Sequence, residues 1–292
     1  MKTPMEIRAA NMAVRDACAR QALRRAEGVS AGDVRAAREV ELERWEAVRA
    51  QMAPLRLPWG MESAEVLAAV AAHRAYWRPA EVRLLILSES HVWTREAEIA
   101  ARVPLAVFGH AAAPAAFARL VYCLGYGERD LVQGRAHPNW GSPQFWKLLA
   151  AGLDPALGAR VVERTEPDLL RRIAAKLRVL EELKARGVWL LDACPVALYA
   201  ASQPKPRMAL LAQAMELAWP TYTREAIRAA APRAVMIVGK MVHDGIGGRI
   251  RAMLGPNVPV QWMYQPQARR PAAEHQAGID RLRGMVRATD AE

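Results

Sequence analysis

Hydrophobic residues gather in four short runs, separated by longer stretches with helical periodicity. The runs cover about 82–87, 188–191, 234–238 and 258–263. Each run is nearly continuous, as expected for a strand that helices cover on both faces. Strands that alternate with helices favour a parallel sheet with right-handed crossovers. We therefore predict an α/β fold, a three-layer α/β/α sandwich with a central four-stranded parallel sheet.

The polar and apolar positions between the strands predict the helices. A hydroxyl at an N-cap followed by proline starts a helix well, so Ser142-Pro143 is expected to begin one. Residues 94–112 give no clear pattern. The other predicted helices cover about 63–76, 113–124, 167–186, 208–218, 221–230, 240–254 and 272–287.

The N-terminal part of the chain has a different pattern. Residues 5–55 are rich in Ala, Arg and Glu and are expected to be helical, and residues 54–60 form a proline-punctuated linker. We predict a helical extension over residues 1–58 and an α/β domain over 59–292. The Arg-rich face of the extension is either solvated surface or a DNA contact.

Charge and cysteine content narrow the class of protein. The net charge of +11 over 292 residues favours polyanion binding, most often of nucleic acid; a composition rich in Ala and Arg is the alternative explanation. Three distant cysteines fit neither a disulfide framework nor a Cys-rich metal site. No apolar run approaches the roughly 18–20 residues of a membrane span, and no signal peptide is apparent. A cytoplasmic protein is expected.

Polar side chains follow each predicted strand. Residues 88–91, Ser-Glu-Ser-His, follow the first strand, and Asp192 follows the second. Gly239-Lys240 follows the third strand, and residues 264–270 follow the last. The carboxyl ends of parallel strands lie at one edge of the sheet, where ligands bind in open α/β folds. The sequence therefore predicts an active site at this edge.

Three segments resemble motifs of the uracil-DNA glycosylase superfamily, and the likeness covers about residues 80–288. Residues 87–91, Leu-Ser-Glu-Ser-His, stand where that superfamily has a motif such as Gly-Glu-Ala-Pro-Gly. Residues 141–153 look like the Pro-Gly-Asn-Arg-Phe-Trp segment of the mismatch-specific branch, and residues 264–270 take the place of the His-Pro-Ser motif.

The chain also departs from these motifs. Ser88 and His91 replace a glycine and a proline, Gln265 replaces a histidine, and Asp192 replaces an asparagine. The cysteine count excludes the iron–sulfur branch. The resemblance implies a divergent DNA glycosylase that removes uracil or another deaminated or damaged base in base excision repair. It implies DNA as partner, no metal, no cofactor, and a monomer.

The resemblance also implies roles for individual residues. Glu89 would activate water or stabilise the sugar cation, assisted by His91 and Gln265. Asp192 and Ser90 would contact the base, and Trp140 would stack on it. The residues expected to contact DNA are Ser88, Ser142, Lys240, Gln267, Arg269 and Arg270.

Each of these residues also has a structural interpretation. Glu89 could cap a helix or form an ion pair, Asp192 could cap a turn, and His91 could be a structural histidine. Phe145 and Trp146 are expected in the core. Two acids at one edge repel, so we expect one pKa to rise, and a protonated Asp192 could donate to a carbonyl.

Two rival functions stay open. One is a nucleic-acid-binding protein that keeps the fold without catalysis, and the other is an enzyme acting on a small molecule such as a nucleoside.

Overall fold

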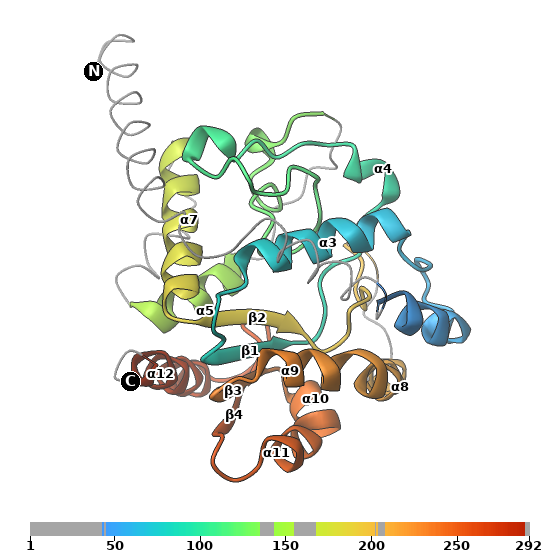
Figure 1. The fold of residues 1–292 in the computed structure, drawn as a ribbon, viewed down its shortest axis with the longest axis vertical. Coiled ribbons are helices and arrows are strands. Elements are labelled where there is room, and N and C mark those ends of the chain that lie inside the picture. Colours follow the sequence, from blue (N-terminus) through green and yellow to red (C-terminus); the bar gives the residue numbers. More distant parts are fainter. Residues whose placement is uncertain are drawn as a thin grey trace.

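The computed structural model describes residues 43, 45–134, 143–154, 168–201, 203 and 208–289. Its centre is an all-parallel sheet with the strand order β2-β1-β3-β4 (Figure 1). The strands are β1 (Leu84–Ser88), β2 (Val188–Asp192), β3 (Ala234–Val238) and β4 (Val260–Met263). All residues of the first three strands are buried, which explains their continuous apolar runs. The predicted fold class is confirmed.

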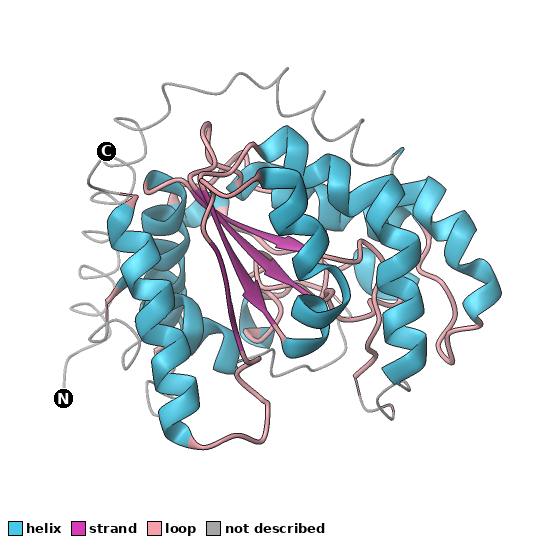
Figure 2. Cartoon of the chain, turned by 90° about the horizontal axis from the view of Figure 1, so that it is seen from below, coloured by secondary structure: helices cyan, strands magenta, loops and turns pink. Residues whose placement is uncertain are grey.

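Helices form a layer on each side of the sheet (Figure 2). On one side α12 packs on α5 and β4, and α5 packs on α7; on the other, α8 contacts the π-helical turns η4 and η5. The bounds are η1 (Ala53–Leu55), α3 (Ala64–Trp77), α4 (Glu96–Ile99), η2 (Ala106–Phe108), η3 (Arg129–Leu131), α5 (Pro143–Leu153), α7 (Leu169–Ala185), α8 (Met208–Ala218), η4 (Trp219–Thr223), α9 (Arg224–Ala230), α10 (Lys240–Val242), η5 (His243–Gly247), α11 (Gly248–Leu254) and α12 (Ala272–Ala288).

Local capping signals account for two of the helix starts. The Ser63 hydroxyl accepts a hydrogen bond from the Val66 amide at 3.4 Å, at the start of α3. The Asp168 carboxylate accepts one from the Leu170 amide at 2.9 Å, at the start of α7. Both side chains satisfy amides that have no partner within the first helical turn.

The helix predicted over 113–124 is wrong, because this segment consists of turns and isolated bridges. Its backbone bonds to other segments: the Ala115 carbonyl accepts from the Val103 amide, and the Phe117 amide donates to the Ala101 carbonyl. Pro114 also removes one helical donor. Tertiary hydrogen bonds and buried side chains, including Phe117, outweigh the local helix preference of this alanine-rich stretch.

The described end of the predicted N-terminal extension packs into the core. Residues 45–52 are helical, and Trp45, Val48 and Met52 are completely buried. The Trp45 ring stacks on the His91 ring with a centroid distance of 6.1 Å. The extension therefore contacts the α/β domain here; residues 1–42 and 44 lie outside the described part of the chain.

The strand order determines where a site can form. The crossover from β1 leads outward to β2, whereas the crossovers from β2 and β3 lead in the opposite direction to β3 and β4. Right-handed crossovers in opposite directions lie on opposite faces of the sheet. The connections leaving β1 and β3 therefore separate, and a crevice opens at the carboxyl ends of these two neighbouring strands.

Candidate active site

A cavity of about 320 Å³ lies at the carboxyl ends of β1 and β2 and extends to the loop after β4. Segments that are far apart in the sequence form its walls: the loop after β1, residues 119–126, the start of α5, the end of β2 and the loop after β4. Glu89, Gln265 and Gln267 all line it, as the positions of their strands predicted. Pockets of this size range commonly hold small ligands.

Glu89 is the carboxylate best placed in this cavity. It follows β1 directly, and its side chain is buried except for a small exposed fraction. The Tyr199 hydroxyl donates a hydrogen bond to Glu89 Oε2. The Glu89 carbonyl accepts a hydrogen bond from the Cys194 amide at 2.9 Å. Both backbone and side chain are therefore held, and the carboxylate has a defined direction.

Gly239 brings Glu89 and Gln265 together. Its φ is +123°, and a Cβ atom there would lie 3.3 Å from Glu89 Oε1 and 3.4 Å from Gln265 Nε2. The missing side chain leaves room for the carboxylate and the amide beside the end of β3. Gln267 Nε2 donates to Gln265 Oε1 at 3.3 Å, which leaves the Gln265 NH₂ group on the side of Glu89. The site thus combines an acceptor and a neutral donor.

Aromatic rings form part of the cavity wall. Tyr126, Phe145 and Trp146 line it. Trp146 is also a core residue, with the Lys176 ammonium 5.4 Å from its ring centroid. Phe145 is only half-buried, so its ring belongs to both core and cavity. Trp140 and Ser142, which we predicted to contact base and DNA, lie outside the described residues.

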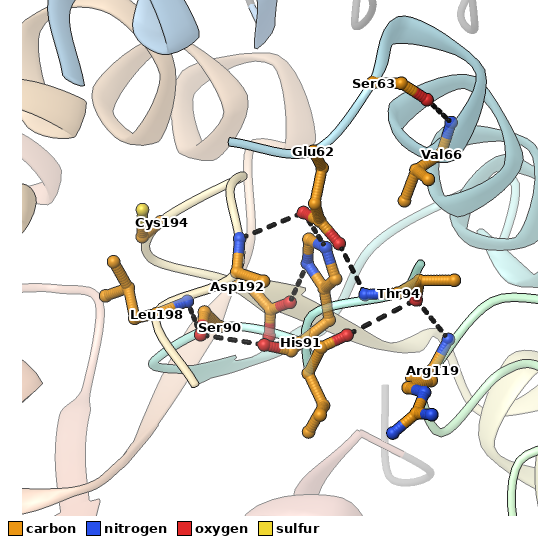
Figure 3. A network of polar contacts seen from close by, with 12 residues as sticks. Glu62, Ser63, Val66, Ser90, His91, Thr94, Arg119, Asp192, Cys194 and Leu198 are labelled. Carbon is orange, nitrogen blue, oxygen red and sulfur yellow. Dashed lines mark hydrogen bonds and ion pairs between the residues drawn. The ribbon is translucent and has the colours of Figure 1, made fainter. Parts of the chain in front are cut away.

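His91 belongs to a buried polar network (Figure 3). Its members His91, Asp192 and Arg74 line one side of the cavity. Its Nε2 donates to Glu62 Oε2 at 2.8 Å, and its Nδ1 lies 3.6 Å from Asp192 Oδ2. Burial alone would lower the pKa of His91, but the two carboxylates outweigh it and raise the pKa to about 9. His91 is therefore an imidazolium held between two acids, and its structural interpretation fits the geometry better than a catalytic one.

The Asp192 carboxylate belongs to the same network. Arg74 Nη2 and the Ser88 hydroxyl donate to its two oxygens. Burial would raise the pKa of Asp192, but Arg74, His91 and Ser88 lower it below its ordinary value. The expected protonated Asp192 is therefore wrong: a buried arginine, which the sequence interpretation did not consider, stabilises the carboxylate.

The two serines of the first motif form hydrogen bonds that connect segments around the cavity. Ser88 bonds to Asp192, and thereby joins the adjacent ends of β1 and β2. The Ser90 hydroxyl donates to the His91 carbonyl at 2.9 Å and accepts from the Leu198 amide at 3.0 Å. These bonds hold the loop after β1 against residues 197–199. Both hydroxyls have protein partners, so their predicted contacts with DNA and base stay predictions.

The predicted DNA-contacting cations lie around the edge of the sheet. Lys240 is about half exposed and forms an ion pair with Asp244. Arg269 and Arg270 are exposed, and the Arg270 guanidinium carbon lies 4.6 Å from the Tyr264 ring centroid. None of the three lines the cavity itself, whereas Gln267, in the same loop, does.

The sequence interpretation missed Glu62, Arg74 and Tyr199. Glu62 is buried and accepts hydrogen bonds from the Thr94 amide at 3.0 Å and the Ala197 amide at 3.1 Å. Arg74 could have been suspected, since it interrupts the apolar pattern of a helix. No sequence signal distinguishes Tyr199, which reaches Glu89 only because residues Val92 and Tyr199 form a bridge between their loops.

Two further observations concern ligands and membranes. Within the described ranges, no group of three or more His, Cys, Asp or Glu side chains is arranged to hold a metal ion. In the same part of the chain, no helix combines the length and apolar character of a membrane span.

Comparison with protein-family models, curated proteins and solved structures gives no match for this chain.

Proposed function

We propose that this protein is a DNA glycosylase that hydrolyses the N-glycosidic bond of a deaminated or damaged base, with Glu89 as its catalytic carboxylate. The position of Glu89 supports the proposal most directly: Glu89 lines the cavity at the carboxyl edge of the sheet, and its Oε1 and the Gln265 amide both lie beside Gly239. A flipped nucleotide needs such a pocket, because the reacting atoms cannot be reached inside a duplex. The resemblance of the strand-end segments to the uracil-DNA glycosylase superfamily supports the same reaction.

Glu89 and Gln265 each have a role in the proposed reaction. Water adds to C1′ of the sugar, and the bond from C1′ to the base nitrogen breaks, with its electron pair leaving on the base. Glu89 takes the proton of the water, or stabilises the positive charge on the sugar, and the proton finally reaches the base. Gln265 donates a hydrogen bond to a base carbonyl as negative charge develops there. The products are a free base and an abasic site.

The geometry changes the roles first expected for His91 and Asp192. Both are held in the charged network with Glu62 and Arg74, so we assign them to positioning the loop that carries Glu89. Gln265 and the aromatic wall then remain to select the base. The proposal involves no cofactor and no metal.

A glycosylase panel tests the proposal. Oligonucleotides that contain uracil, hypoxanthine, xanthine or a mismatch are incubated with wild type, Glu89→Gln and Glu81→Gln. Glu81 lies before the amino end of β1, away from the cavity, and its pairing with Arg233 is exposed. We expect abasic product from at least one substrate, a loss of at least about 100-fold in Glu89→Gln, and wild-type rates in Glu81→Gln. If no substrate gives an abasic product, the proposal that this protein is a DNA glycosylase is refuted.

A non-catalytic nucleic-acid-binding protein is the second candidate. It is favoured by the burial of Glu89, whose Oε2 already accepts the Tyr199 hydroxyl. Tight, salt-dependent DNA binding without base release would support it. Release of base from mononucleosides but not from DNA would instead indicate a nucleoside hydrolase.

A further inference from the structure

The segment from Gly239 to Pro271 carries a large share of the protein's positive charge. It contains five Lys or Arg residues and one acid, Asp244, which gives +4 of the net charge of +11. It comprises α10, η5, α11 and β4, the edge strand farthest from β2 (Figure 1). It also reaches the cavity, because Gln265 and Gln267 lie in the loop after β4.

A row of aromatic and cationic side chains runs along this segment. Arg251 Nη2 donates to His243 Nε2 at 2.9 Å. The His243 ring stacks on Trp262 with a centroid distance of 4.9 Å and an interplanar angle of 22°. Trp262 meets Tyr264 edge-on at 4.9 Å, and Arg270 lies over the Tyr264 ring. The rings thus hold two guanidinium groups in fixed positions between α11 and the loop after β4.

Three exposed arginines of this segment have no carboxylate partner in the described part of the chain. Among the described residues, no carboxylate lies within ion-pair distance of Arg251 or Arg270, which belong to the row, or of Arg269, which precedes Arg270. Arg249, two residues from Arg251 on α11, does have one: its Nη2 lies 2.7 Å from Glu216 Oε2. Exposed arginines that are held in place but not neutralised are available for an external anion.

We propose that these arginines bind the phosphodiester backbone of a nucleic-acid strand that continues from the cavity along β4 and α11. This inference rests on the proposed function, since the cavity would hold the flipped nucleotide of the same strand. A planar guanidinium matches a phosphate group in a bidentate arrangement, and stacking on aromatic rings reduces the side-chain freedom lost on binding. Arg251 extends the contact beyond the loop of Arg269 and Arg270, along the outer edge of the sheet.

The salt dependence of binding tests this surface without requiring catalysis. Affinity for an undamaged single-stranded oligonucleotide is measured between 50 and 200 mM salt for wild type, Arg251→Gln and Arg249→Gln. Each lost phosphate contact lowers the slope of log affinity against log salt by about 0.7 for a single strand. Wild type should therefore lose about 2.6-fold more affinity over this range than Arg251→Gln. Arg249→Gln removes the same charge from the same helix and should keep the wild-type slope.

Several outcomes would overturn the proposal. Equal slopes for Arg251→Gln and wild type would do so, as would an equal decrease in both variants, which would indicate net charge alone. Competition by poly-glutamate as strong as that by an oligonucleotide of equal charge would indicate a surface for acidic protein segments instead. If the protein excises a base but Arg251→Gln keeps the wild-type slope, the proposed function stands and only the proposed binding surface is refuted. If no base is excised but Arg251→Gln lowers the slope, only the proposed catalysis is refuted.

Discussion

The pair formed by Glu62 and His91 makes the stability of this protein depend on pH, and Glu62→Gln tests the reasoning. Glu62 accepts three hydrogen bonds, from His91 Nε2 at 2.8 Å and from the amides of Thr94 and Ala197. A glutamine has one acceptor oxygen and turns an NH₂ group toward at least one of these donors. It also leaves a buried imidazolium with only Asp192 beside it. Breaking such a buried pair costs about 3–5 kcal/mol.

The sign of the pH dependence follows from the pKa of His91. Folding raises this pKa from 6.5 to about 9. The folded state therefore binds the proton more tightly, so its stabilisation is complete below pH 6.5 and is lost as the pH rises toward 9. A pKa difference of one corresponds to about 1.4 kcal/mol, so the contribution is on the order of 3 kcal/mol.

Urea unfolding at pH 6, 7, 8 and 9 measures this effect. We expect the free energy of unfolding of the wild type to fall across this range and that of Glu62→Gln to be lower and flatter. Glu98→Gln is the matched control, because Glu98 is equally buried but pairs with Arg119, at 2.6 Å. Arginine stays protonated throughout, so this variant should be destabilised yet keep the wild-type pH slope. A flat wild-type curve, or a Glu62→Gln curve as steep as that of the wild type, would refute the reasoning.

Two further predictions concern the cavity. Gly239→Ala should abolish base excision and destabilise the fold by about 1–3 kcal/mol, because the φ of +123° is unfavourable for alanine and the added Cβ would crowd Glu89 and Gln265. Single-turnover excision and thermal melting measure the two effects. A variant as active and as stable as the wild type would contradict the prediction. Tyr199→Phe removes the hydroxyl that orients Glu89, so we expect about tenfold slower excision, on the order of 1.4 kcal/mol, with unchanged oligonucleotide affinity. An unaltered rate would show that Glu89 does not need this hydrogen bond.

The strands and most helices could be predicted because their signals are local. Strand β3 has the predicted bounds, and α8 begins at Met208 and ends at Ala218 as expected. The segment 113–124 could not be predicted, since its backbone partners lie at Ala101 and Val103. Helical propensity describes a chain without tertiary partners, and these partners changed the outcome.

The sequence by itself determined the parallel sheet and which side chains stand at its carboxyl edge. Continuous apolar runs require burial on both faces, and alternation with helices requires parallel crossovers, so Glu89, Asp192 and Gln265 had to lie at one edge. Only the tertiary structure decided what each of them does. Arg74 and Glu62 come from outside the strand ends, and they turn Asp192 and His91 into a buried charged network. Glu89 faces the cavity because Gly239, which follows β3, leaves room beside it. Charge and hydrogen bonding act through distance in space, and that distance is set by packing between segments far apart in the chain.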